Sequence, residues 1–316
     1  MTTHMKQTPM NITTASLYHL LQQFAPGAEL ARWQTLAGGF SAEMIALEVR
    51  LPTGENRKVI ARLHGARDLG INPDVALDQY RLLQSLTKTR LPVPRPLHLD
   101  QTRETFDQPI LVLEYVEGST DIAPADLASC LPQMAEMLAR IHNVDPLTND
   151  LKFLASEEQR NNTRIAQRPE VLDETLQEGR IRDTLEKVWP LAVRNTATLL
   201  HGDYWSGNVL WVQTENGREI VAVIDWENAV IGDPVEDVAN ARMEIFWDFG
   251  AEAMEVFTRE YRSMSNADFA MLPWWDLCAA LRPAGRLADW ATSKQEEDKM
   301  RGGHALFVAQ AMRNIA

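Results

Sequence analysis

The chain has few features that would mark it as a secreted, disulfide-bonded or membrane protein. Its 316 residues include two cysteines, Cys130 and Cys278, which are too few for a disulfide framework and have no metal-ligand spacing. We expect both to be buried, reduced thiols of a cytoplasmic protein. Residues 1–14 are polar and lack the apolar run of a signal peptide. No stretch approaches about 18 consecutive apolar residues, so the sequence predicts no transmembrane helix.

Positive charge is also scarce. The 31 basic and 44 acidic side chains give a net charge of −13. Nucleic acids and anionic membrane surfaces both attract clustered Lys and Arg, so we expect neither as a partner. Hydrophobic residues make up 45% of the chain and charged residues 24%, which are ordinary values for a globular protein. The balance is compatible with a cationic small-molecule partner.

The pattern of predicted elements changes near residue 115. Before it, apolar runs bounded by glycine and proline predict strands, at 33–36, 43–50, 57–63 and 109–116, with one helix at 75–86. After it, apolar residues recur at helical spacing, in the segments 127–144, 169–193, 235–249, 252–261, 274–291 and 304–315. One β-rich segment, 199–226, interrupts the helices. The sequence therefore predicts an α+β protein with a small β-rich N-terminal lobe and a larger helical lobe.

The β-rich segment contains the most informative polar residues. It has His201-Gly-Asp203, with Asn208 five residues after the aspartate, and Asp225 directly after the apolar run 220–224. Residues 215–217 are a turn signal, and a hairpin around them would bring the ends of its two strands together. We therefore expect Asp203, Asn208 and Asp225 to converge around one metal-sized site.

Phosphoryl transfer from ATP needs these residue types. One carboxylate orients or deprotonates the acceptor hydroxyl, while a second carboxylate and an amide oxygen hold magnesium against the phosphates. Protein kinases use an Asp, an Asn five residues later and a further metal-binding Asp. On this pattern Asp203 is the predicted base, and Asn208 and Asp225 are the predicted metal ligands. The alternative is a chance cluster of turn-forming residues, and the flanking apolar runs favour the functional interpretation.

These residues, together with Gly232-Asp-Pro-Val-Glu-Asp237, resemble the aminoglycoside phosphotransferase and choline kinase family. Weaker similarities follow in the family's order at 36–41, 91–94, 110–118 and 138–142 and extend the resemblance over most of the chain. The resemblance implies a protein-kinase-like two-lobe fold and the use of ATP and Mg²⁺. The implied divisions are a β-rich nucleotide lobe at 1–113, a hinge at 114–118, and a helical lobe at 119–316 with the catalytic loop and the acceptor site.

The resemblance also assigns roles to individual residues. It makes Asp203 the catalytic base and Asn208 and Asp225 the magnesium ligands. The implied nucleotide-binding residues are Gly38, Gly39, Ser41, Arg62, Glu114 and Val116. His201 is expected to hold the catalytic loop, and Asp237 to brace it by accepting backbone N–H groups. For Asp233, and as an alternative for Asp237, simple helix capping is the competing interpretation.

The sequence departs from the kinase pattern at the phosphate clamp. Arg62 occupies the position of the strand lysine, and alternation along the strand predicts that Ile60 and Arg62 share one face. The helix glutamate position falls at Gln79, with Asp78 and Asp74 as nearby acids. The glycine loop is short as well, and an ordinary β-turn is its competing interpretation. These departures motivate the alternative of a non-catalytic nucleotide-binding pseudokinase.

The acceptor site is expected in the helical lobe near the base. Several acids occur there, and they favour a cationic acceptor such as an amino sugar or amino alcohol: Glu236, Glu244, Asp248, Glu252 and Asp276. Trp205, Glu244 and Asp248 are the candidate acceptor residues, because a tryptophan can also bind ammonium through its ring. The competing interpretation is a solvated acidic surface with core tryptophans.

The function that the sequence favours is transfer of the ATP γ-phosphate to a hydroxyl group of a small molecule, with magnesium. The pseudokinase interpretation is opposed by the presence of Asp203, Asn208 and Asp225 together. A third candidate, a metal-dependent hydrolase, is weakened by the lack of a histidine-rich ligand set.

Overall fold

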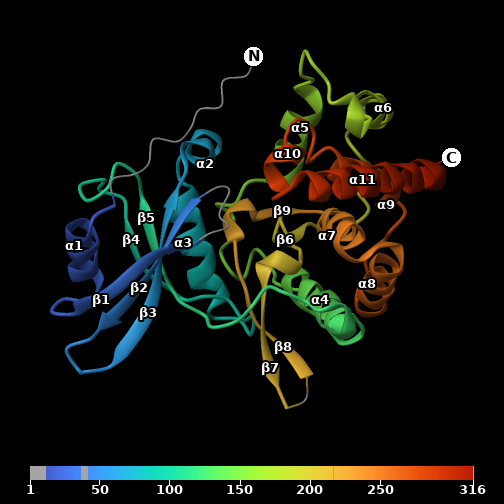
Figure 1. Ribbon diagram of the computed structural model, residues 1–316. Helices are drawn as coiled ribbons and strands as arrows, with labels where there is room; N and C mark the ends of the chain where they lie inside the picture. Colours follow the sequence, from blue (N-terminus) through green and yellow to red (C-terminus); the bar gives the residue numbers. More distant parts are fainter. Residues whose placement is uncertain (1–11, 37–41, 216, 316) are drawn as a thin grey trace. The chain divides into compact units, whose positions relative to one another are not determined.

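The computed structural model describes residues 12–36, 42–215 and 217–315 (Figure 1). Contacts divide the chain into two compact units. The first unit contains the chain up to Tyr80 and the segment Arg95–Tyr115. The second unit contains Arg81–Pro94 and the chain from Val116 onward. Among the described residues, no helix is both long and apolar enough to cross a membrane.

The first unit is built on a five-stranded antiparallel sheet with the order β1-β2-β3-β5-β4. Its strands are β1 (Glu29–Leu36), β2 (Ala42–Arg50), β3 (Asn56–His64), β4 (Pro96–Asp100) and β5 (Ile110–Glu114). The turn between β2 and β3 contains Gly54 at a φ of 86°, a conformation that glycine adopts without a steric cost. The predicted hairpin over residues 43–63 is thus confirmed. Two helices, α2 (Ala66–Ile71) and α3 (Val75–Leu86), follow β3.

One face of the sheet is covered by α1 (Thr14–Phe24), a helix that the sequence analysis did not predict (Figure 1). Thr13 caps it by accepting a hydrogen bond from the backbone N–H of Ser16. Its apolar residues follow helical spacing and join a core cluster with β2 and β3, which includes Leu17, Leu20, Leu21, Leu47, Val59 and Leu63. The opposite face of β3 is therefore the one that carries Ile60 and Arg62.

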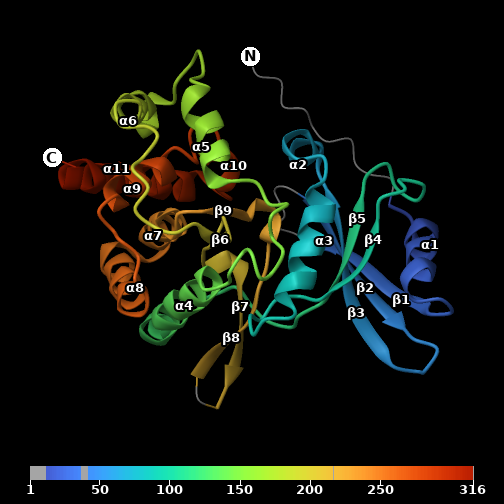
Figure 2. The same ribbon diagram turned by 180° about the vertical axis from the view of Figure 1, so that it is seen from behind.

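The second unit is mainly helical. Its helices are α4 (Leu127–His142), α5 (Glu157–Ala166), α6 (Glu178–Leu185), α7 (Pro234–Phe249), α8 (Ala251–Met264), α9 (Leu272–Ala280), α10 (Leu287–Trp290) and α11 (Lys294–Ile315). Two small antiparallel sheets pair β6 (Thr198–Leu200) with β9 (Val230–Gly232) and β7 (Val209–Thr214) with β8 (Gly217–Val223). Helix α8 packs beside α4 and α7, and α9 contacts α7 and α11 (Figures 1 and 2).

Two of the predicted helices are shorter than expected. The segment 169–193 contains only one α-helix, α6, because the residue before it, Gln177, has a left-handed backbone with a φ of 56°. The segment 274–291 is divided into α9 and α10 around Pro283 and Gly285, which has a φ of 70°. A proline and a left-handed glycine both interrupt helical hydrogen bonding. The charged, amphipathic pattern alone did not reveal these breaks.

Candidate active site

The predicted catalytic residues lie at the ends of β6, β7 and β8 in the second unit. Asp203 follows β6, Asn208 ends a short 3₁₀ turn before β7, and Asp225 follows β8. Val209 pairs with Val223 across the hairpin, and the Ile224 N–H donates to the Asn208 carbonyl over 2.9 Å. The hairpin thus places the backbones of Asn208 and Asp225 beside one another. Residue 216, in the predicted turn, lies outside the described residues.

A side-chain hydrogen bond links Asn208 to the predicted base. Its Nδ2 donates to the Asp203 backbone carbonyl over 2.8 Å and lies 3.4 Å from Asp203 Oδ2. Because Nδ2 is used in this way, Oδ1 of Asn208 is the amide atom that remains for a cation. Asp225 has a left-handed backbone with a φ of 72°, and such uncommon conformations occur often at functional sites. An amide oxygen and a carboxylate fit magnesium, which prefers hard oxygen ligands.

His201 connects the segments that carry Asp203 and Asp225. Its Nδ1 accepts from the Asp203 backbone N–H over 3.3 Å, and its Nε2 lies 2.9 Å from the Ile224 carbonyl. With Nδ1 as acceptor, Nε2 carries the proton and donates it to that carbonyl. The ring also packs on Trp226, with 4.5 Å between ring centroids. Both ring nitrogens are therefore engaged in holding the loop.

Asp237, in the first turn of α7, holds the same loop through backbone N–H groups. Its two carboxylate oxygens accept the backbone N–H groups of His201 and Gly202 over 2.6 and 2.9 Å. Burial would raise the pKa of Asp237, but the hydrogen bond of His142 and the Gly202 N–H are among the interactions that outweigh burial and lower it. Asp237 is therefore an ionised brace. Asp233 instead caps α7 by accepting the Val235 N–H over 2.9 Å.

The loop needs glycine at position 202. Gly202 has a φ of 79°, and a Cβ atom there would lie 2.0 Å from the carbonyl oxygen of Asn228. That approach is far below van der Waals contact, and the other atom is backbone. A side chain at this position would therefore displace the backbone immediately before Asp203.

Arg282 is a residue of this site that the sequence analysis missed. Its Nη2 donates to Oδ1 of Asp203 and lies 3.5 Å from the Gly202 carbonyl. Burial would lower the pKa of Arg282, but the carboxylates of Asp203 and Glu244 outweigh burial and raise it. The guanidinium is thus a permanent cation beside the predicted base. Arg282 follows α9 and is separated from Asp203 by 79 positions, so no local motif signals the contact.

Two of the candidate acceptor residues contact the short 3₁₀ turn Ser206–Asn208. The ring of Trp205 covers Gly207, where a Cβ atom would approach it to 2.4 Å. Asp248, near the end of α7, accepts a hydrogen bond from the Ser206 hydroxyl over 3.0 Å. Burial raises the pKa of Glu244, also on α7, to about 8 despite the nearby Arg282, and Asp203 and Asp248 add to the rise. Glu244 is therefore mostly protonated at neutral pH.

The other acids that suggested a cationic acceptor have different surroundings. Glu236 accepts from Arg160 over 2.7 Å, and Asp276 forms two hydrogen bonds of 3.1 Å with the buried Arg242. Glu252 is exposed on α8. Two of the five acids are therefore neutralised by arginines.

In the first unit, the predicted nucleotide residue Arg62 lies on the sheet face opposite α1. Met44 and Leu111 are its neighbours on the adjoining strands, and its side chain is buried. Gln79 on α3 is buried too, and its Oε1 has no hydrogen-bond partner among the described residues. Asp78 accepts instead from Asn72 over 2.9 Å, so its carboxylate is used within the turn that precedes α3.

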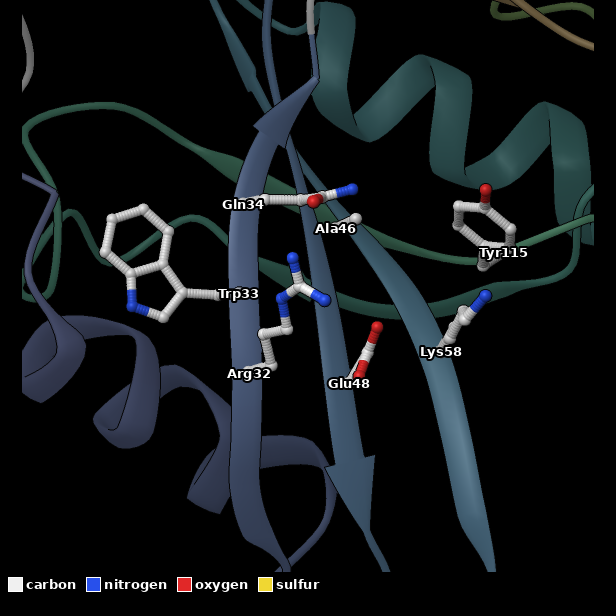
Figure 3. A pocket seen from close by; sticks show the side chains of 7 residues that line it. All are labelled: Arg32, Trp33, Gln34, Ala46, Glu48, Lys58 and Tyr115. Atoms are coloured by element: carbon white, nitrogen blue, oxygen red, sulfur yellow. The ribbon is translucent and has the colours of Figure 1, made fainter.

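The same face continues toward the predicted hinge (Figure 3). Arg32, Glu48 and Lys58 form one row across β1, β2 and β3, and Gln34, Ala46 and Ile60 form the next. With Tyr115, these strands line a cavity of about 30 Å³. Trp33 of β1 is also among the residues that line the cavity (Figure 3), and its indole N–H donates to Thr14 over 3.1 Å.

The other predicted nucleotide-binding residues belong to the hinge and to the glycine loop. The side chain of Glu114 is paired with Arg95 over 3.0 Å, and its backbone N–H donates to the Arg95 carbonyl over 2.9 Å. Val116 is partly exposed at the start of the larger segment of the second unit. Gly38, Gly39 and Ser41 lie outside the described residues.

Comparison with known proteins identifies the family. The model of the phosphotransferase enzyme family matches residues 32–275, so the chain belongs to this family. Acyl-CoA dehydrogenase family member 10 of Mus musculus is 25% identical over 178 residues, which are 51% of this chain and 16% of that protein. Hygromycin-B 4-O-kinase of Escherichia coli is 37% identical over 93 residues, which are 29% of this chain and 25% of that protein. The chain thus spans a quarter or less of these relatives.

Solved structures show the same fold over nearly the whole chain. A putative aminoglycoside phosphotransferase from Ralstonia eutropha has a TM-score of 0.66 at 18% identity, over 95% of this chain and 98% of that one. A thermostable mutant of aminoglycoside phosphotransferase APH(4)-Ia, in a ternary complex with ADP and hygromycin B, has a TM-score of 0.63 at 19% identity, over 94% of this chain and 98% of that one. The predicted α+β, protein-kinase-like fold is confirmed.

Proposed function

We propose that the protein transfers the γ-phosphate of ATP to a hydroxyl group of a small molecule in a magnesium-dependent reaction. The observation that carries the proposal is the arrangement of Asp203, Asn208 and Asp225 at adjoining strand ends, fixed by His201 and Asp237. A loop this constrained is typical of a catalytic site, where groups must be held in place before the substrate arrives. The names of relatives, a 4-O-kinase and a viomycin phosphotransferase, support the same chemistry.

Asp203 is the proposed base. Its Oδ1 contacts Arg282, while the one side-chain contact of Oδ2 among the described residues is the 3.4 Å contact with Asn208. Oδ2 is therefore the oxygen that accepts the hydrogen bond of the acceptor hydroxyl, orients it and receives its proton during transfer.

Asn208 and Asp225 are the proposed magnesium ligands, through Oδ1 and the carboxylate. These two residues would hold the ion against the phosphates of ATP, where it would neutralise their negative charge. Their positions at one end of the hairpin make the two ligands a single rigid unit.

The nucleotide is proposed to bind the sheet face of the first unit that carries Arg62. Arg62 supplies a charge-assisted contact to phosphate, Ala46 and Ile60 offer apolar surface to the base, and the backbone of Glu114–Val116 offers its polar edge. The predicted loop with Gly38, Gly39 and Ser41 belongs to the same proposal. We further propose a cytoplasmic location, where ATP is available and where free, buried Cys130 and Cys278 stay reduced.

Two measurements test the proposal. Thermal unfolding with and without nucleotide reports nucleotide binding, and ADP release reports phosphoryl transfer. ATP with magnesium should raise the melting temperature, since a ligand at 100 times its Kd adds about 2.7 kcal/mol of stability. EDTA and Asp225→Asn should each reduce the shift and abolish ADP release with a panel of hydroxyl compounds. The matched control is Glu219→Gln, because Glu219 is an exposed acid on β8, the strand that precedes Asp225. If ATP with magnesium raises the melting temperature fully but no compound of the panel causes ADP release, the result would support the pseudokinase instead.

A further inference from the structure

The surroundings of Asp203 contain more arginine than the acidic composition suggests. Arg282 contacts Asp203 directly. Arg164 on α5 donates to Asn161 over 3.1 Å, and burial, with the charges of Arg160 and Arg282, lowers the pKa of Arg164 to about 10. The charge of Arg282 is one of the causes that lower the pKa of Arg164, so the two guanidinium groups repel each other. Both remain charged at neutral pH.

The acids of the same region do not supply an equal negative charge. Glu236 is buried and paired with Arg160 over 2.7 Å. Burial, reinforced by Glu236, raises the pKa of Glu157 to about 7, and the pKa of Glu244 is about 8. A carboxyl group whose pKa lies above the ambient pH is mainly neutral. Glu236 is thus paired with an arginine and Glu244 is mainly protonated, so neither of these acids on α7 offers an unpaired negative charge to an ammonium group.

Arg282 also has unused hydrogen-bonding capacity. Its Nη2 is directed to Asp203, but its Nη1 is buried and has no hydrogen-bond partner among the described residues. A buried guanidinium N–H without a partner is costly, and the group that a guanidinium binds best is a carboxylate held by two parallel hydrogen bonds. The site therefore offers an incoming carboxylate a cation next to the atom that accepts the hydroxyl proton.

We propose that the acceptor is a hydroxy acid. This inference rests on the proposed phosphotransferase function and specifies its substrate class. The hydroxyl group of the acceptor meets Oδ2 of Asp203, and its carboxylate binds Arg282, with Arg164 adding charge from α5. Since Arg282 touches Asp203, the acid group and the reacting hydroxyl lie within a few bonds of each other. The amino sugar or amino alcohol that the sequence analysis favoured lacks the group that this arginine binds.

Matched acceptors that differ in one group test the proposal. ADP release is measured for a hydroxy acid, its amide and the amino alcohol of the same chain length, and for a sugar acid, the parent sugar and the amino sugar. The acids should have a kcat/KM roughly 10- to 100-fold above that of their neutral analogues, the range for hydrogen bonds to charged groups. Equal values for acid and amide, or a preference for the amines, would overturn the inference and leave the phosphotransferase function in place.

Arg282→Gln separates substrate binding from support of Asp203. We expect the KM of the acid to rise roughly 10- to 100-fold and the preference for acid over amide to disappear, with Arg282→Lys restoring part of it. A residue that only positioned Asp203 would lower kcat equally for acid and amide and leave the preference unchanged. Arg259→Gln removes the same charge from an exposed site on α8, where Arg259 contacts Glu260 over 3.0 Å, and should preserve the preference.

A second variant keeps the test decisive if Arg282→Gln does not fold. Arg164→Gln should reduce the preference for acids without removing it, because Arg164 acts only through its charge. An unchanged preference in a folded Arg164→Gln protein would contradict that role. If no hydroxyl compound of any charge is phosphorylated, the proposed function fails, and the inference fails with it.

Discussion

Asp203 makes different contacts through its two carboxylate oxygens, and this difference gives the first prediction. Asp203→Asn keeps the shape of the side chain but removes the charge that accepts the proton of the hydroxyl. We expect kcat to fall by roughly 10²- to 10⁴-fold, the usual contribution of a general base, while ATP affinity stays nearly unchanged. Steady-state kinetics with an identified acceptor and calorimetry with ATP check both parts. An unchanged kcat would remove Asp203 from the proposed role.

Arg62 gives a second prediction at the scale of one residue. If it binds ATP phosphates, Arg62→Ala should weaken ATP binding by about 1.5–3 kcal/mol, and Arg62→Lys should recover only part of the loss because a point charge cannot reproduce the planar fork. Calorimetric titration of ATP measures the three affinities. Arg57→Ala is the control, since Arg57 lies on the same strand but is exposed and paired with Glu55. Equal affinities for all proteins would place Arg62 outside the nucleotide site.

At the scale of elements, the loop between β6 and β7 depends on Gly202. Gly202→Ala should destabilise the fold by more than the roughly 1–3 kcal/mol of backbone strain that a left-handed residue costs, because the new Cβ also meets the Asn228 carbonyl. Activity should be lost at temperatures at which the variant is still folded. Urea unfolding and ADP release measure the two effects.

Gly54→Ala provides the comparison for this prediction. Gly54 also has a positive φ, 86°, but nothing lies within 4 Å of its Cβ position. This variant should show only the cost of backbone strain and should keep its activity. If the two variants lose the same stability and both remain active, the close approach at Gly202 does not matter.

The elements also show what a sequence pattern can predict. The β2–β3 hairpin and the β7–β8 hairpin follow from short apolar runs between turn residues, so their pairing was predictable. Strand β4 (Pro96–Asp100) was not predicted, and no spacing indicated that β5 lies between β3 and β4. Helix α1 was missed because residues 1–14 are polar, and the helical pattern around Leu17, Leu20 and Leu21 is short. The break before α6 depends on the left-handed backbone of Gln177, and the presence of a glutamine does not predict that conformation.

The candidate site was predictable to the extent that it is local in sequence. Asn208 and Asp225 flank one hairpin and Asp203 lies five residues before Asn208, so the spacing predicted that the backbones of Asn208 and Asp225 lie side by side. Arg282 reaches Asp203 from the far end of α9, and Arg164 approaches from α5. Such contacts depend on how α5, α7 and α9 pack, and no spacing in the chain encodes that packing.

At the scale of the whole molecule, the acids of the second unit affect its stability through pH. Folding raises the pKa of Glu244 from 4.5 to about 8, so the folded state binds a proton that the unfolded state loses first. Stability should therefore fall as the pH rises from about 4.5 toward about 8. Glu244→Gln removes the titration. The free energy of unfolding of Glu244→Gln minus that of the wild type should increase as the pH rises through this range, and the difference should be constant above it.

Urea unfolding at a series of pH values measures this difference. Glu252→Gln is the control, because Glu252 is an exposed acid on the neighbouring helix α8. Its difference from the wild type should not vary with pH across the same range. A constant difference for Glu244→Gln as well would show that Glu244 is ionised in the folded protein.

The contacts that hold the three catalytic candidates are almost all made within one stretch of chain. His201, Asn208, Ile224 and Asp237 bond to one another or to Asp203 between β6 and the first turn of α7. Arg282 belongs to a separate part of the sequence. A recombination event that exchanged residues 198–237 with a relative would move the proposed base and both proposed metal ligands as a block. The recipient would keep its own residue at the position of Arg282, so the contact that Arg282 makes with the base can change separately from the block.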